Sequence, residues 1–229
     1  MARVVMNGSS AAWTGASQAK YEALTTMQHS IKQRVDELRA ATIGVTYLFF
    51  SSGKNAGLVL VRAADGSATS VLRWITTAGV LIVESSGFDF ALMPANGNDV
   101  RVDASYTSGG AATFRVRNLV TNTDVLNSTS GSALPALSTA AGSGEFYPRY
   151  GAWDAWAIFS SVRSGDALNV RPRSTDADVV GLHFFPEGSG LTSVDLRGGN
   201  PFVLDTSTWD AAGEWDANVP RLEAYQIFF

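Results

Sequence analysis

Few residues of this chain have the type and spacing that catalysis requires. The 229 residues include two histidines and no cysteine. His29 and His183 do not lie near a Gly-x-Ser-x-Gly motif and form no pair at metal-ligand spacing. No glycine-rich loop leads from a strand into a helix, as phosphate-binding loops do. We therefore expect no catalytic residue, no metal ligand and no cofactor.

Two acidic pairs could still do chemistry if folding brought them together. Asp176 with Asp178, and Asp210 with Asp216, carry the carboxylates that calcium sites and glycosidases use. Carboxylates in loops are more commonly solvated, and glycosidase carboxylates meet only in three dimensions. The sequence leaves calcium binding and hydrolysis open, and we expect a protein that is not an enzyme.

Binding chemistry is better represented, because aromatic side chains with a polar group suit the apolar faces and hydroxyls of sugars. Aromatic and charged residues gather in two Gly- and Pro-punctuated segments, and binding residues concentrate on such loops. The alternative is that these aromatics fill the core or a subunit interface. The predicted ligand-binding residues are Tyr147, Arg149, Tyr150, Trp153, Trp209, Asp210 and Trp215.

The element that would position these residues is a helix predicted over residues 17–44. Its apolar residues recur at alternating steps of three and four, which is a short heptad seam with one polar position. β-Branched residues at both seam positions favour a coiled coil of three helices over one of two. An amphipathic helix lying on its own domain is the alternative. The predicted oligomerisation residues are Tyr21, Leu24, Gln28, Ile31, Val35 and Leu38.

The rest of the chain predicts a mainly β fold, with an antiparallel sandwich or jelly-roll-like head over residues 45–229. Short β-branched and aromatic runs alternate with turn signals every 8 to 12 residues or so. Residues 99–107 and 112–120 alternate apolar with charged side chains, which is typical of antiparallel strands with one solvated face. Residues 127–144 are rich in Ser, Ala and Gly, and they are either a long packed loop or a linker that divides the head.

Composition narrows the classes of partner. The net charge is −4 and charged residues make up 17% of the chain, so a nucleic-acid partner is not expected. No apolar run approaches the roughly 20 residues needed to span a bilayer. The first ten residues hold one basic residue and no long apolar run, so we expect no secretory signal. Residues 1–16 are expected to be an attachment segment that docks on a partner.

This plan, an attachment segment, a heptad helix over 21–38 and a β head rich in small residues, resembles the short fibres and spikes of tailed bacteriophages and gene transfer agents. The resemblance implies a virion-exposed homotrimer that contacts other virion proteins through its N-terminal end. It also implies binding of a host surface polysaccharide or receptor by the head. The alternatives are a purely structural virion protein, such as a capsid decoration, collar or baseplate element, and, third, a polysaccharide depolymerase.

Overall fold

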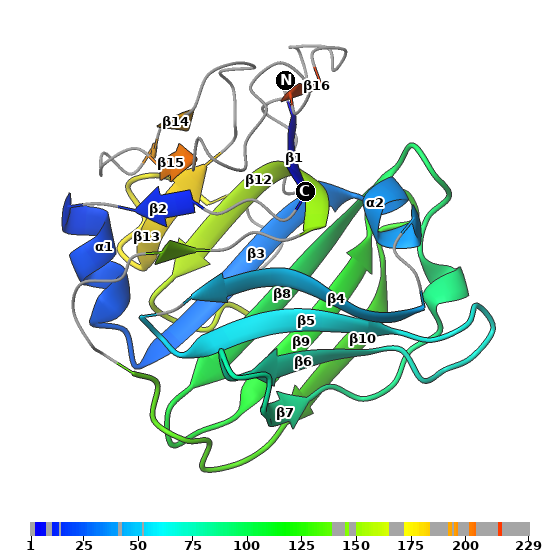
Figure 1. Ribbon diagram of the computed structural model, residues 1–229, viewed down its shortest axis with the longest axis horizontal. Coiled ribbons are helices and arrows are strands. Elements are labelled where there is room, and N and C mark those ends of the chain that lie inside the picture. The colour runs from blue at the N-terminus through cyan, green and yellow to red at the C-terminus, as the bar shows by residue number, and fades with distance from the viewer. Residues whose placement is uncertain are drawn as a thin grey trace.

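Two antiparallel β-sheets packed face to face make up most of the protein (Figure 1). The computed structural model describes residues 3–7, 11–13, 15–40, 43–51, 53–138, 145–146, 150–164, 172–183, 192–193, 195–196, 202–204 and 215–216. Every strand pair within these residues is antiparallel, so the predicted mainly β class is confirmed.

Sheet A has the strand order β10-β9-β8-β3-β12-β1-β16, and β13 lies beside β1 on the same edge of β12. Its strands are β1 Arg3–Asn7, β3 Thr26–Arg34, β8 Asp99–Thr107, β9 Ala112–Asn118, β10 Thr123–Ser130, β12 Tyr150–Phe159, β13 Val179–His183 and β16 Trp215–Asp216.

Sheet B has the order β14-β15-β2-β11-β4-β5-β6-β7. Its strands are β2 Ala11–Trp13, β4 Gly44–Ser51, β5 Ala56–Arg62, β6 Val71–Ile75, β7 Leu81–Glu84, β11 Glu145–Phe146, β14 Thr192–Ser193 and β15 Phe202–Leu204. The helices are α1 Gly15–Glu22, α2 Val35–Ala40 and the 3₁₀ turn η1 Phe90–Leu92. Among the described residues, no helix has the length and apolar character needed to cross a membrane.

The continuous helix predicted over residues 17–44 is wrong. Residues 15–22 form α1, residues 26–34 form β3 in the middle of sheet A, and residues 35–40 form α2. Lys54 stops α1, because its buried ammonium donates to the carbonyl oxygens of Glu22 at 2.6 Å and Leu24 at 2.8 Å. Burial lowers the pKa of Lys54 to about 8. Residues 26–34 are a strand because they pair with β8 and β12, although their apolar spacing predicts a helix.

The heptad residues lie within the chain's own fold. Tyr21, Ile31, Val35 and Leu38 belong to the buried core, and Leu24 packs against it. Gln28 lies on the opposite face of β3 from Ile31 and is also buried. The described structure therefore shows no seam that a neighbouring helix could share.

His29 joins α1 to both sheets. Trp156 Nε1 donates to His29 Nδ1 at 3.2 Å, and the Tyr21 hydroxyl lies 3.4 Å from His29 Nε2. Because an indole N–H only donates, the proton of the neutral imidazole is on Nε2. Trp74 of sheet B has its ring centroid 6.1 Å from that of His29 and donates to the Ser105 carbonyl of sheet A at 3.0 Å.

The outer face of sheet A is buried at its centre, which differs from the predicted solvated face. Arg101 and Asp103 are 1% and 3% exposed, although they alternate with the core residues of β8. Arg101 Nε donates to Asp103 Oδ2 at 2.9 Å, and the Ser30 hydroxyl donates to Oδ1 at 2.5 Å. A buried ion pair with these additional hydrogen bonds therefore connects β8 to β3.

Acid is expected to destabilise the fold through His29. Burial lowers the pKa of His29 to about 3, well below its ordinary value of 6.5. The unfolded state then binds more protons than the folded state between pH 6.5 and 3, so stability is lost as the pH falls through that window. One group contributes a slope of at most about 1.4 kcal/mol per pH unit. Urea unfolding of wild type and His29→Asn across this range measures the slope, which is expected to be smaller in the variant. Equal slopes would contradict the assignment.

Removing one partner of the buried ion pair is expected to cost much more than removing both. Asp103→Ala leaves the Arg101 guanidinium buried without its carboxylate and is expected to lower the free energy of unfolding by about 3–5 kcal/mol. The double variant Arg101→Met/Asp103→Leu leaves no buried charge and is expected to lose less. Urea denaturation measures both values. A double variant less stable than the single one would show that the pair itself stabilises the fold.

Candidate functional site: an arginine pocket beside α2

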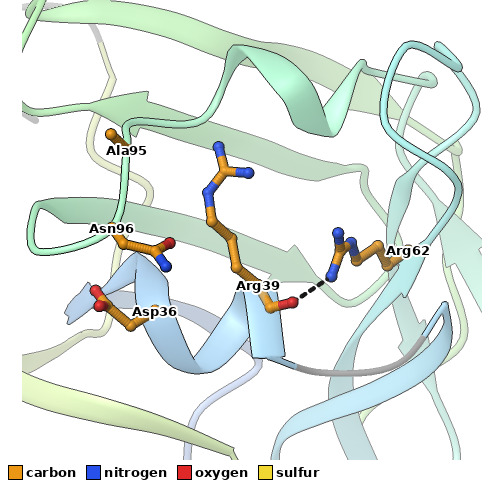
Figure 2. A pocket seen from close by; sticks show the side chains of 5 residues that line it. All are labelled: Asp36, Arg39, Arg62, Ala95 and Asn96. Carbon is orange, nitrogen blue, oxygen red and sulfur yellow. Dashed lines mark hydrogen bonds between the residues drawn. The ribbon is translucent and has the colours of Figure 1, made fainter.

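A pocket of about 550 Å³ opens where α2, the end of β5 and the loop after η1 meet (Figure 2). Its volume is within the usual range of small-ligand pockets. The side chains that line it are Asp36, Arg39, Arg62, Ala95 and Asn96.

Arg39 connects α2 to the loop that follows η1. Its Nε donates to the Pro94 carbonyl at 3.1 Å and its Nη2 to the Met93 carbonyl at 3.0 Å. Its Nη1 lies 3.6 Å from Asp65 Oδ2. These contacts fix the guanidinium, and a group that is already oriented loses less entropy when it binds a ligand.

Arg62 lies across the pocket and is anchored to the same helix. Its Nη1 donates to the Arg39 carbonyl at 2.6 Å (Figure 2). Its Nη2 donates to Asp65 Oδ1 at 3.1 Å. The guanidinium carbons of Arg62 and Arg39 lie 4.5 and 5.6 Å from the centroid of the buried Phe90 ring. An apolar ring beneath two cations keeps water from one side and strengthens their field.

The opposite wall is polar and open. Asp36 Oδ2 accepts a hydrogen bond from the Gly97 backbone at 2.8 Å, and Asn96 is exposed beside it. Gly97 has a φ of +87°, a conformation that glycine adopts without steric cost. The pocket thus combines two fixed guanidiniums with a carboxylate and an amide. Guanidiniums bind carboxylate, sulfate or phosphate, and the amide and the carboxylate suit hydroxyl groups.

Sequence reasoning missed this pocket. Arg39 falls within the helix predicted over residues 17–44 but outside its seam, and Arg62 ends an otherwise apolar strand. No sequence pattern predicts that two arginines 23 positions apart contact the same Phe90 ring. Only the packing of α2 against the end of β5 brings them together.

The predicted ligand-binding residues are partly placed by the structure. Tyr147, Arg149, Trp209 and Asp210 lie outside the described residues. Tyr150 and Trp153 are in β12, and Trp215 is in β16. Trp153 pairs with Val4 of β1, which pairs in turn with Trp215. The sheet therefore brings two tryptophans 62 positions apart into one cross-strand row, in which Gln33 of β3 is the next member.

Asp176 and Asp178 both form ion pairs with Arg163. Arg163 Nη2 donates to Asp176 at 2.9 Å and to Asp178 at 2.6 Å. The hydrogen bond from Arg163 lowers the pKa of Asp178. For Asp176, burial raises the pKa, but bonds from the Arg173 backbone and Arg163 outweigh it and the pKa is lowered. Both carboxylates are therefore ionised partners of Arg163. Asp216 lies in β16 and Asp210 outside the described residues.

Neither histidine is available to a ligand. His29 lies inside the sandwich, and His183 is also fully buried. Within the described ranges, no three His, Asp or Glu side chains gather as a metal site. The chemistry that the described surface offers is ion pairing and hydrogen bonding at the arginine pocket.

No protein-family model and no curated protein matches the sequence. Among solved structures, the chain is similar to the enzymatically active domain of bacteriophage CBA120 tailspike protein 2, with a TM-score of 0.43 and 14% identity. That match covers 63% of this chain and 23% of the tailspike chain. The chain is also similar to scytalido-glutamic peptidase with a transition state analog inhibitor, with a TM-score of 0.28, 11% identity, and coverage of 89% and 95%.

These comparisons correct one prediction. The expectation that the protein is not an enzyme is contradicted, because one similar structure is titled an enzymatically active domain and the other a peptidase. The first is a phage tail protein, in agreement with the coarse resemblance drawn from sequence. With TM-scores below 0.5, no residue role, substrate or mechanism is taken from either protein.

Proposed function

We propose that this protein attaches a virus particle to an acidic glycan of the host surface, and that the arginine pocket binds a carboxylate of that glycan. The observation that carries the proposal is the pair of guanidiniums, Arg39 and Arg62, held over the buried Phe90 ring at the mouth of an open pocket. A uronic acid fits this arrangement, because it presents one carboxylate and several hydroxyls on a ring.

The charges at the pocket suit a small ligand that carries one carboxylate beside its hydroxyls. The chain as a whole has a net charge of −4, which does not favour binding of polyanions. Two of the five lining side chains are arginines and one, Asp36, is a carboxylate, while Asp65, outside the lining, pairs with both arginines. Two guanidiniums that are partly compensated in this way suit a sugar with a single carboxylate better than a densely charged polymer such as nucleic acid.

The virion setting comes from the sequence, which is low in charge and rich in small residues, as in phage fibre heads. A homotrimer, and attachment to other virion proteins through the N-terminal end, stay predictions. The trimer has lost its main support, since residues 26–34 are a strand of the sandwich. A purely structural virion protein is the competing function, and it requires no glycan binding.

The arginine pocket is expected to discriminate acidic from neutral sugar. Tetragalacturonate should bind, and its methyl ester should bind at least tenfold more weakly, a difference of about 1.4 kcal/mol. Arg62→Met should lower the affinity for the acid by a similar factor, and Asn96→Ala, at an exposed position, by less. Isothermal titration calorimetry measures each affinity, and mass spectrometry of the incubated sugar reports any cleavage.

Arg73→Met is the matched control. Arg73 is an arginine of sheet B whose partner, Glu84 at 2.8 Å, is outside the pocket. The Arg73→Met variant should bind tetragalacturonate as tightly as the wild type does. Thermal unfolding of each variant checks that it is folded. Equal losses in Arg73→Met and Arg62→Met would show a general charge effect, and no binding by the wild type would favour the structural role.

A further inference from the structure

Asn96 and Gly97, on the open wall of the arginine pocket, are two residue types that can react with one another when they are neighbours in a chain. Both residues are exposed, and Figure 2 shows the Asn96 side chain beside Asp36. They form the tip of a turn that is closed by the Asn98 backbone N–H, which donates to the Ala95 carbonyl at 3.3 Å. The side-chain amide of an asparagine can be attacked by the backbone nitrogen of the next residue, and glycine hinders that attack least because it has no side chain.

The surroundings of Gly97 leave room for this reaction. Its φ of +87° is a conformation that glycine adopts without steric cost. A Cβ added at this position would meet no atom within 4 Å other than those of its chain neighbours. The Asn96 side chain can therefore close onto the Gly97 nitrogen without displacing another part of the fold, and solvent water reaches the product.

A base already lies at the nitrogen that must lose its proton. Asp36 Oδ2 accepts a hydrogen bond from the Gly97 backbone N–H at 2.8 Å, which is within the reach expected of a general base. A backbone amide is a poor nucleophile until this proton is removed. The hydrogen bond lies in the plane of the amide, whereas the electron pair that attacks lies above and below that plane. Asp36 can therefore take the proton without blocking the attack.

We propose that Asn96 is a site of self-modification, at which Asp36 acts as the base and the side-chain amide is converted to an acid. A bond forms between Gly97 N and Asn96 Cγ, and the bond between Cγ and Nδ2 breaks. The proton of Gly97 N passes through Asp36 to Nδ2, which leaves as ammonia, so that a five-membered succinimide remains. Water then opens this ring. Opening between the nitrogen and Cγ gives aspartate, opening between the nitrogen and the main-chain carbonyl carbon gives isoaspartate, and neither step needs an oxidant or a reductant.

The modification changes the charge of the arginine pocket, and this consequence rests on the proposed function. The lining now sets the guanidiniums of Arg39 and Arg62 against the carboxylate of Asp36. Conversion of Asn96 adds a second carboxylate to the same wall, which repels a ligand carboxylate and competes with it for the guanidiniums. The pocket therefore binds an acidic sugar more weakly once Asn96 has reacted, and the affinity falls as the protein ages.

The test follows each asparagine by peptide mass spectrometry while the folded protein is incubated at mildly alkaline pH. Asn7–Gly8 is the other Asn-Gly pair of the sequence, and it serves as an internal reference in every sample. Asp36→Asn should slow the modification of Asn96 at least about tenfold, because a positioned general base commonly contributes about 10²–10⁴-fold. Asp124→Asn is the matched control, since it removes a carboxylate of sheet A that pairs with Arg115 outside the pocket. It should leave the rate at Asn96 unchanged.

The proposal is overturned if Asn96 stays an amide while Asn7 reacts. It is equally overturned if Asp36→Asn leaves the rate at Asn96 unchanged or raises it, because Asp36 then only holds Gly97 in place. Thermal unfolding checks that both variants are folded.

Calorimetry with tetragalacturonate tests the consequence for the pocket. Asn96→Asp copies one product of the reaction and should bind more weakly than Asn96→Ala, and equal binding by the two variants would overturn this consequence. The mass measurement involves no sugar. A wild type that modifies Asn96 but binds no tetragalacturonate would therefore count against the proposed function and support the modification site.

Discussion

The pairing of β3 on both of its edges is the constraint on which the described structure depends. All nine residues of β3 pair with β8, and residues 28–34 also pair with β12. A central strand has its backbone groups satisfied on both sides, so its place in the sheet is strongly fixed. β3 also lies between α1 and α2 in the chain. Its register therefore sets where α2 begins, and with it the positions of Asp36 and Arg39 in the pocket.

The sequence predicts most strands and misses this one for a physical reason. The bounds 99–107 agree with β8, because Val100, Val102 and Ala104 alternate with charged residues on a regular period of two. On β3 two of the four core-facing residues are polar, His29 and Gln33, and they hide the same alternation. Apolar residues in the flanking helices then supply a spacing that imitates a heptad. The pattern is local, whereas the pairing that decides the structure is with strands about 70 and 125 positions away.

The functional residues were less predictable than the fold, because they are assembled by contacts across the sequence. Aromatic composition pointed to Trp153 and Trp215, and the register of β1 does place them in one row. No pattern pointed to Arg62, whose role depends on meeting α2 over the Phe90 ring. Residue types predicted sugar-binding chemistry, which stays a prediction, and only the topology shows which of these residues share a row.

The fold holds the polar groups of the arginine pocket in place before any ligand is present, and this bears on what the pocket can bind. In the pocket, Arg39 is held by backbone carbonyls and by Asp65, so a ligand meets an orientation that is already fixed. Such a site binds at little conformational cost, and it keeps part of its charge compensated when empty.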